Sequence, residues 1–362
     1  MKIPFLDLSR LHVRQLDSLN QIFSQTLLND RLSGGASVKA FEDNFAAYLG
    51  VPYCVSCANG TDALEIILRA LNIGPGDEVI VPANGWLSAA EMVKLVGARP
   101  VFVDIDPYTY NMGLSRVEAV ISSKTKAIMP IHLYGLPMEM PALMNMADKH
   151  GLYVIEDCAQ AHGSHIHGKM SGSWGHAGAF SFYPTKNLGA IGDAGAIVTA
   201  DARLAEKCRM IANHGQSTRD EHQVLGRNSR MDSLQAAVLN FRLEQLDACN
   251  VQRRLLARLY HEHLQDLPLT FPHEKEGFFH VYHLFVISTR ERDALRTFLG
   301  EKGIGTLIHY PVAVSDMAHL NPSPAPLASQ LSQKILSLPL YPEMTEEEIL
   351  EVCQAIRKYF EG

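Results

Sequence analysis

The sequence predicts an α/β fold in which helices sandwich a mainly parallel sheet, followed by a smaller C-terminal α+β domain. Short apolar runs alternate with segments of helical periodicity from residue 51 to residue 156, and the connections between them are short. This alternation is typical of β–α–β units, which build parallel sheets covered by helices on both faces. The chain has 362 residues, of which 47% are hydrophobic, and this is enough for one large domain and a smaller one.

The large domain is expected to span residues 1–249. Apolar residues recur at helical spacing from about Ile22 to Leu49, with a turn at residues 32–35 and a helix over residues 38–48. Strands are then predicted at residues 51–57, 78–82, 99–105, 126–131 and 152–156. The intervening helices are predicted at residues 61–71, 87–96, 115–121 and 140–149. A second apolar run at residues 177–183 precedes helices expected at residues 202–212 and 232–246.

The smaller domain is expected to span residues 250–362. Apolar periodicity continues through its beginning, so no disordered linker is predicted. Its expected elements are a strand at residues 280–288, a helix at 292–301, a strand at 306–309, a proline-rich loop at 311–326 and a helix at 345–360. Thr345, followed three residues later by Glu348, predicts a capping box at the start of the last helix.

Charge and cysteine content exclude several classes of protein. The formal net charge of -7 argues against nonspecific binding to nucleic acid or to an anionic membrane surface. The six cysteines are too sparse for a disulfide scaffold, and the pair Cys54 and Cys57 lies in a predicted strand without a second pair at zinc-like spacing. We therefore expect no metal site. The N-terminus lacks the apolar segment of a signal peptide, so a cytoplasmic location is expected.

Candidate binding residues lie at or just after the ends of predicted strands. They are Gly60, Thr61, Trp86, Asp157 and Ser181. Ligands of parallel α/β sheets bind beyond the carboxyl ends of the strands, so these side chains are expected to line one pocket.

Two of these positions allow a structural explanation as well as a functional one. The segment Asn59-Gly60-Thr61 lies between a strand and a helix whose first amides suit a phosphate group. An ordinary helix N-cap with a glycine turn explains that segment more simply when it is taken alone. Trp86 follows a strand-end turn, where its indole could stack on a flat heteroaromatic ring or simply pack against the protein.

Asp157 and Lys186 suggest the chemistry of the site. Asp157 follows an apolar run, where a carboxylate needs a cationic partner such as a protonated pyridine nitrogen, although it could also cap the next segment. Lys186 lies in an apolar, glycine-containing segment that favours a neutral amine, the form that reacts with carbonyl compounds. The histidines at residues 162, 165 and 167 lack further ligands at metal-binding spacing, so surface or supporting roles are expected for them.

Longer motifs resemble one family. They are I-P-F-L-D-L at residues 3–8, A-N-G-T-D-A-L at 58–64, G-D-E-V-I-V-P at 76–82, E-D-C-A-Q-A-H-G at 156–163, S-F-Y-P-T-K-N-L-G at 181–189, N-S-R-M-D-S-L-Q-A-A at 228–237, I-H-Y-P at 308–311 and L-S-L-P-L-Y-P at 336–342. Together they resemble the pyridoxal-phosphate-dependent sugar aminotransferases of the DegT/DnrJ/EryC1/StrS group. The resemblance spans nearly the whole chain and implies the fold type I aminotransferase architecture.

The resemblance also implies roles for individual residues. Lys186 matches the lysine that binds the cofactor covalently and transfers protons, Asp157 matches the acid at the pyridine nitrogen, and Gln160 matches the amide at the phenolic oxygen. The other matching positions are Gly60, Thr61 and Ser181 for the cofactor phosphate, Trp86 for stacking, and Asn228 for the phosphate in the neighbouring subunit. The last match implies a homodimer with shared sites. From the residues alone, the segment 227–230 either caps the following helix or reaches a phosphate.

The expected reaction is a transamination, because relatives that act as sugar dehydratases have histidine in place of Lys186. L-glutamate is the expected amino donor, and pyridoxamine 5′-phosphate is the expected form of the cofactor between the two half-reactions. The motif at residues 181–195 is similar to the subgroup acting at C3 of nucleotide-linked 3-keto-6-deoxyhexoses, and a dTDP sugar is the expected acceptor. Tyr183 and His309 are the candidate sugar or diphosphate contacts.

Two departures from the family pattern concern the site. Gly85-Trp86 stands where relatives often have threonine before an aromatic residue, and Thr185 stands where glycine is common in the C3 subgroup. Two alternatives remain open at this point, a 4-keto sugar aminotransferase and a non-catalytic regulatory protein that binds the cofactor. A nicotinamide-dependent Rossmann enzyme would need a Gly-x-Gly-x-x-Gly turn after the first strand, which residues 56–62 lack.

Overall fold

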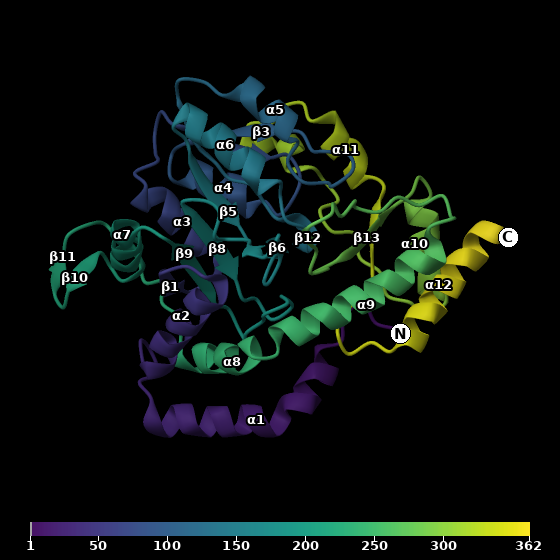
Figure 1. The fold of residues 1–362 in the computed structure, drawn as a ribbon, viewed down its shortest axis with the longest axis horizontal. Coiled ribbons are helices and arrows are strands. Elements are labelled where there is room, and N and C mark those ends of the chain that lie inside the picture. The colour runs from purple at the N-terminus through teal and green to yellow at the C-terminus, as the bar shows by residue number, and fades with distance from the viewer. Residues whose placement is uncertain (1) are drawn as a thin grey trace.

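A seven-stranded sheet forms the centre of the large domain (Figure 1). The computed structural model describes residues 2–362. In spatial order the strands are β1 (Tyr53–Cys57), β9 (Gly195–Thr199), β8 (Ala177–Ser181), β5 (Tyr153–Asp157), β4 (Thr125–Ile128), β2 (Glu78–Pro82) and β3 (Arg99–Val103). The pairs from β8 to β3 are parallel, whereas β9 runs antiparallel to both of its neighbours. The predicted mainly parallel sheet is therefore confirmed.

Helices cover both faces of this sheet because its strands bury side chains on both sides. In β2, Val79 and Val81 pack into one hydrophobic cluster, and Ile80 between them packs into another on the opposite face. On the first face lie α3 (Gly60–Ala70), α4 (Ser88–Leu95) and α7 (Ala202–Ala212). On the second face lie α2 (Ala36–Leu49), α5 (Leu114–Val117), α6 (Met140–His150) and α8 (Ser233–Leu243). This arrangement explains why the strand sequences are almost continuously apolar.

The smaller unit has a hydrophobic cluster of its own. It contains the antiparallel pair β13 (Phe285–Ser288) and β14 (Ile335–Leu338) together with α10 (Arg292–Glu301), α12 (Glu346–Glu361) and part of α9 (Leu246–Leu264). Ile3 belongs to this cluster and pairs with Ile304, so the N-terminal segment packs against the C-terminal unit. Residues 249 and 250 both lie within α9, and the division into residues 1–249 and 250–362 stays a prediction.

Several elements differ from the predicted ones. The first helix, α1 (Leu8–Asn29), starts well before Ile22, and the helix predicted at residues 232–246 is interrupted between α8 and α9. The strand predicted at residues 306–309 is only an isolated bridge between Leu307 and Ser337. This stretch stays irregular because Tyr310 has a left-handed backbone, with φ 60°, and turns the chain toward the large domain. The strand predicted at residues 280–288 keeps only its last four residues, as β13.

Short elements complete the fold. They are β6 (His165–Ile166), β7 (Lys169–Met170), β10 (Gln216–Thr218), β11 (Glu221–His222), β12 (Phe278–Phe279) and α11 (Pro326–Ser332). The β10–β11 hairpin projects beyond α7 at the left of Figure 1. Across residues 2–362, no helix combines the length and the apolar character needed to cross a membrane.

The predicted capping box of α12 is confirmed and supplies a stability test. The Thr345 hydroxyl accepts a hydrogen bond from the Glu348 amide at 3.2 Å, and the Glu348 carboxylate accepts one from the Thr345 amide at 3.0 Å. We expect Thr345→Ala to lower the free energy of unfolding by about 1 kcal/mol, because the first turn loses an acceptor. Thr345→Ser keeps the hydroxyl and should retain most of the stability. Urea denaturation measures both, and equal losses in the two variants would contradict the role of the hydroxyl.

Candidate active site

The predicted binding residues converge at one edge of the sheet. The carboxyl ends of β1 and β8 meet there with the start of the antiparallel strand β9, and Gly195 pairs with both Cys57 and Ser181. A Cβ atom on Gly60 would lie 2.6 Å from Cβ of Ser181, and one on Gly195 would lie 2.3 Å from the Asn59 carbonyl carbon. Glycine at these two positions therefore allows the turn that begins α3 to lie directly against β8 and β9.

The start of α3 has features of both explanations that the sequence left open, a capped helix N-terminus and a phosphate-binding turn. Asn59 is the N-cap, and its side chain accepts a hydrogen bond from the Asp62 amide at 2.8 Å. Within residues 2–362, the amides of Gly60 and Thr61 donate no hydrogen bond. The Thr61 hydroxyl lies 3.0 Å from the Ser88 hydroxyl, and Ser181 is adjacent to Gly60. Free amides at a helix N-terminus beside hydroxyl groups suit a phosphate.

Asp157 lies at the end of β5 as a mostly buried carboxylate. Its Oδ1 accepts a hydrogen bond from the Ala159 amide at 3.0 Å, so it does support the following turn. Burial raises the pKa of Asp157, whereas the Ala159 amide and the charge of Lys186 act in the opposite direction. No ion pair within 4 Å joins Asp157 to a cationic side chain among the described residues. A cationic ligand group at this place would stabilise the ionised carboxylate.

Lys186 is partly buried in the turn that follows β8. Its backbone amide donates to the Tyr183 carbonyl oxygen at 2.8 Å. Burial lowers the pKa of Lys186 from 10.5 to about 8, although the charge of Asp157 opposes this effect. A substantial fraction of the amine is therefore neutral near physiological pH, as carbonyl chemistry requires.

A group of aromatic side chains surrounds Gln160. Gln160 Oε1 accepts a hydrogen bond from the Tyr134 amide at 2.6 Å, and its Nε2 donates to the Tyr310 hydroxyl. Tyr310 stacks on Tyr134 with 6.1 Å between the ring centroids, and its ring lies 6.4 Å from Trp86. Trp86 is 58% exposed, so part of its surface is available to a ligand. Trp86 lies two residues before the start of α4.

Sequence reasoning missed Tyr310 as a site residue. The only available signal was its place in the I-H-Y-P motif, because nothing in the spacing predicts that it reaches Gln160 from another part of the chain.

Among the described residues, the Asn228 side chain forms no hydrogen bond with the other site residues, although the hydroxyl of the next residue, Ser229, accepts one from the Ala58 amide at 3.1 Å. Asn228 is exposed, and its side-chain oxygen accepts a hydrogen bond from Arg230 Nε at 3.1 Å. Arg227 forms ion pairs with Asp62, at 3.0 Å, and with Glu65 on α3. Arg227 is therefore bound to carboxylates of its own chain, and the role of the segment 227–230 at a phosphate stays a prediction.

The two candidate substrate contacts differ in their surroundings. Tyr183 is 53% exposed. His309 is half-buried, and its Nδ1 lies 2.8 Å from the Ser337 hydroxyl. Burial, and to a smaller extent Lys186, lowers the pKa of His309 to about 4, so its ring is neutral at physiological pH. His309, His283 and Thr185 line a cavity with a volume of about 420 Å³.

The histidines at residues 162, 165 and 167 lie in different surroundings. His162 is fully buried beside Phe180 and Phe182, and burial lowers its pKa to about 3. His165 stacks on Phe279 with 4.6 Å between the ring centroids. Burial also raises the pKa values of the Cys54 and Cys57 thiols, which disfavours the thiolates that bind metals. These surroundings suit packing better than coordination.

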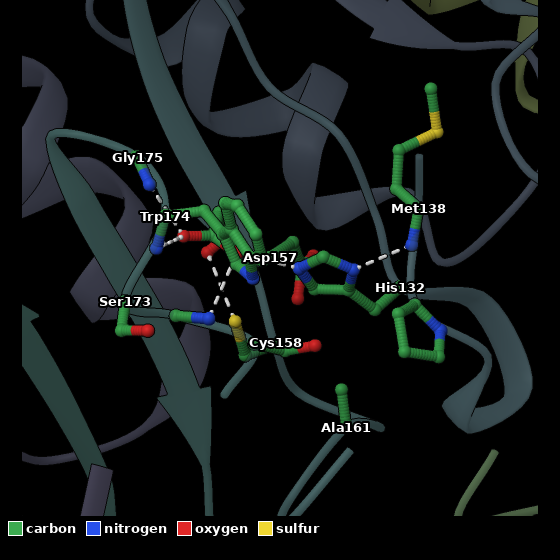
Figure 2. Close-up of polar contacts among 12 residues, drawn as sticks. His132, Met138, Asp157, Cys158, Ala161, Ser173, Trp174 and Gly175 are labelled. Carbon is green, nitrogen blue, oxygen red and sulfur yellow. Dashed lines mark hydrogen bonds and ion pairs between the residues drawn. The ribbon is translucent and has the colours of Figure 1, made fainter. Parts of the chain in front are cut away.

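One buried cluster does bring possible metal ligands together. Atoms of His132, Glu156 and Cys158 lie within 4.8 Å of one another. Backbone amides and the His132 ring, however, already bind both oxygens of Glu156 (Figure 2). The cluster therefore forms an internal hydrogen-bond network beside Asp157.

The low pKa of Lys186 leads to a prediction for the protein without cofactor. The rate of acylation of Lys186 by acetic anhydride should rise with pH and reach half its maximum at about pH 8, because the neutral amine is the nucleophile. In the urea-unfolded chain the midpoint should move up to about pH 10.4, the value for a hydrated lysine. Peptide mass spectrometry measures both rates.

A matched variant tests the electrostatic part of this prediction. Asp157→Asn removes the negative charge that raises the pKa of Lys186, so the midpoint should move further down. A midpoint near the unfolded value in the folded protein would show that Lys186 is not desolvated.

Known proteins support the chemistry that this geometry suggests. The family model described as the DegT/DnrJ/EryC1/StrS aminotransferase family matches residues 15–357. A UDP-N-acetyl-3-dehydro-alpha-D-glucosamine 3-aminotransferase from Acidithiobacillus ferrooxidans is 46% identical, over 99% of this chain and 98% of the relative. A dTDP-3-amino-3,6-dideoxy-alpha-D-galactopyranose transaminase from Aneurinibacillus thermoaerophilus is 43% identical, over 99% of both chains.

A solved structure agrees with these relatives. The crystal structure of NtdA from Bacillus subtilis with bound cofactor PMP superimposes with a TM-score of 0.93 at 32% identity, and the match covers 99% of this chain and 85% of that one. The residues described above fit such a cofactor, since free amides and hydroxyls lie at the start of α3, and the same edge of the sheet carries a carboxylate without a cationic side-chain partner and an amine with a lowered pKa. The chain belongs to the DegT/DnrJ/EryC1/StrS aminotransferase family and is a pyridoxal-phosphate-dependent aminotransferase.

Proposed function

We propose that this aminotransferase moves the amino group of L-glutamate to the C3 keto group of a nucleotide-diphosphate-linked keto-6-deoxyhexose. The observation that carries the proposal is the similarity over 99% of the chain to two enzymes whose names place the nitrogen at C3 of a nucleotide sugar. One of these names refers to a UDP sugar and the other to a dTDP sugar. We propose the dTDP-linked sugar, and the UDP-linked sugar is the alternative that the test includes.

The proposed roles at the cofactor follow the geometry of the site. The cofactor supplies an aromatic ring that withdraws electrons from the carbon that loses or gains a proton. We assign the ring nitrogen to Asp157, because a buried carboxylate without a cationic side chain is stabilised by a protonated pyridine. Lys186 Nζ then holds and moves the proton at the reacting carbon, and its lowered pKa suits an acid–base catalyst.

The other cofactor contacts are proposed from the same edge of the sheet. The amides of Gly60 and Thr61 and the hydroxyls of Thr61 and Ser181 bind the phosphate. The Gln160 amide has a second Nε2 hydrogen available for the phenolic oxygen, because only one donates to Tyr310. The exposed part of Trp86 stacks on the cofactor ring.

The sugar is proposed to bind on the side of Lys186 where His309 lies. The cavity lined by His309, His283 and Thr185 provides space next to the lysine-bearing turn. His309 is neutral and its Nδ1 contacts Ser337, so its Nε2 is available for one hydrogen bond with a sugar hydroxyl, as donor or acceptor according to the tautomer. Tyr183 is exposed and is proposed as a contact to the diphosphate.

The substrate is tested with a panel of nucleotide sugars. The purified protein and L-glutamate are mixed with 3-keto and 4-keto sugars linked to dTDP or UDP, and the products are identified by mass spectrometry and NMR. We expect amination at C3 of a dTDP-linked sugar. Amination of 4-keto sugars alone would contradict the position, and amination of UDP sugars alone would contradict the nucleotide.

Lys186→Ala is the control for this panel. It should abolish turnover with every sugar, because the acid–base group at the reacting carbon is lost. A wild-type protein whose cofactor absorbance does not change with glutamate would favour the non-catalytic regulatory role instead.

We also propose that the active form is a homodimer with shared sites. Asn228 is exposed, and among the described residues its side chain forms no hydrogen bond with the Lys186 site of its own chain. Along α1, which runs beside α8 at the bottom of Figure 1, the side chains of Val13, Leu16 and Leu28 are 73%, 52% and 82% exposed. A second copy of the chain would cover this apolar helix and place Asn228 at the phosphate of the neighbouring site.

We further propose a cytoplasmic location.

Complementation tests the shared site. The variants Lys186→Ala and Asn228→Ala should each have low activity, but a mixture unfolded and refolded together should exceed both. In the mixed dimer one site carries both substitutions and the other carries neither. Activity of the mixture equal to the average of the two parents would show that each site is built from one chain.

A further inference from the structure

A buried carboxylate lies directly behind Asp157. Glu156 precedes it on β5 and is fully buried, and successive side chains of a strand point to opposite faces. Asp157 therefore faces the site while Glu156 faces away from it. Glu156 Oε1 accepts hydrogen bonds from the amides of Trp174 and Gly175, at 2.8 and 2.7 Å. Its Oε2 accepts one from the Gly172 amide at 2.8 Å and contacts His132 Nε2 at 2.9 Å.

The hydrogen bonds of His132 determine where its proton lies. His132 Nδ1 accepts a hydrogen bond from the Met138 amide at 2.9 Å, so this nitrogen carries no proton. The proton is on Nε2, which donates to Glu156. Figure 2 shows the hydrogen bond between the His132 ring and the Met138 amide. The two oxygens of Glu156 thus accept hydrogen bonds from four donors.

The same network is connected to the backbone of Asp157. The His132 amide donates to the Asp157 carbonyl oxygen at 3.1 Å, and the Asp157 amide donates to the Pro130 carbonyl oxygen at 2.8 Å. The loop that supplies the three amides lies tightly against the strands, since a Cβ on Gly175 would be 2.7 Å from the Val154 carbonyl oxygen. One carboxylate therefore joins the end of β5, the segment after β4 and the loop before β8.

We propose that Glu156 is a positioning residue for the cofactor: through His132 and the loop at residues 172–175 it holds the end of β5 so that the Asp157 carboxylate meets the pyridine nitrogen. This inference rests on the proposed role of Asp157. Asp157 has only one hydrogen bond of its own, to the Ala159 amide, so its direction depends on how firmly the backbone around it is held.

Glutamine cannot take the place of Glu156 in this network. Each oxygen of the carboxylate faces two donors, so an NH2 group on either side would face N–H groups. The His132 ring cannot relieve this by moving its proton, because Nδ1 would then face the Met138 amide. A buried donor left without an acceptor is destabilising, and the rearrangement that relieves it displaces the end of β5.

The test follows the protonation of the cofactor ring in the holoenzyme. The proteins are loaded with cofactor labelled with ¹⁵N at the ring nitrogen, and the chemical shift of that nitrogen is measured by NMR together with the dissociation constant of the cofactor. In Glu156→Gln we expect the shift to move toward that of a neutral pyridine and the dissociation constant to rise by about tenfold. Asp157→Asn provides the reference for a ring that has lost its acid.

A matched control separates positioning from stability. Glu78 is also a buried carboxylate of the central sheet, but it lies at the start of β2, at the opposite edge from the site, where it accepts from the Ser122 hydroxyl at 2.6 Å and pairs with Arg99. Glu78→Gln should lower the melting temperature without moving the ring-nitrogen signal. A Glu156→Gln protein that also loses only stability and keeps the wild-type signal would overturn the inference.

A milder variant covers the case in which Glu156→Gln does not fold. His132→Asn removes one of the four donors and leaves the carboxylate in place, so it should move the ring-nitrogen signal in the same direction by a smaller amount. An unchanged signal in His132→Asn would then overturn the inference. If Asp157→Asn itself leaves the signal unchanged, the proposed role of Asp157 fails, and this result is distinct from failure of the positioning role alone.

Discussion

Desolvation at one edge of the sheet is the constraint on which the active site depends. Burial moves the pKa of Lys186 down and that of Asp157 up, so it disfavours the charged form of both groups. Their mutual attraction opposes this only in part. A protonated aromatic nitrogen near Asp157 would keep that carboxylate ionised. For Lys186, burial favours the uncharged form of the amine. Desolvation therefore favours a cationic partner for Asp157, and it raises the fraction of Lys186 that is neutral and able to react.

The topology of the sheet makes this edge compact. If β9 were parallel to β8, its start would lie at the far edge, and Gly195 could not pair with both Cys57 and Ser181. The reversed strand instead brings a glycine against the turn at Asn59, where a Cβ atom would overlap the backbone. The free amides of α3 consequently lie beside Ser181. The proposed phosphate site depends on backbone packing as much as on the hydroxyl groups that line it.

Patterns within short stretches of sequence predicted the strands and the helix start, which depend on interactions between residues close together in the chain. The alternating apolar runs located the strands, and Thr345 with Glu348 located a helix start. Contacts between distant segments were not predictable in this way. Tyr310 reaches Gln160 only because the chain turns at its positive φ value, and the strand expected at residues 306–309 is lost in the same turn. The proton position of His132 depends equally on the amide of Met138, which no spacing in the sequence reveals.

The adjacent acids Glu156 and Asp157 lie on one strand but have opposite hydrogen-bond environments. Both are buried, yet four donors surround Glu156 and a single amide binds Asp157. A carboxylate whose acceptor sites are filled is held in one place and is a poor partner for a ligand. A carboxylate with unused acceptor sites can bind a ligand but is free to turn unless its backbone is held. Because the peptide units around the two residues are shared, the saturation of Glu156 is what allows Asp157 to stay unsaturated without losing its orientation.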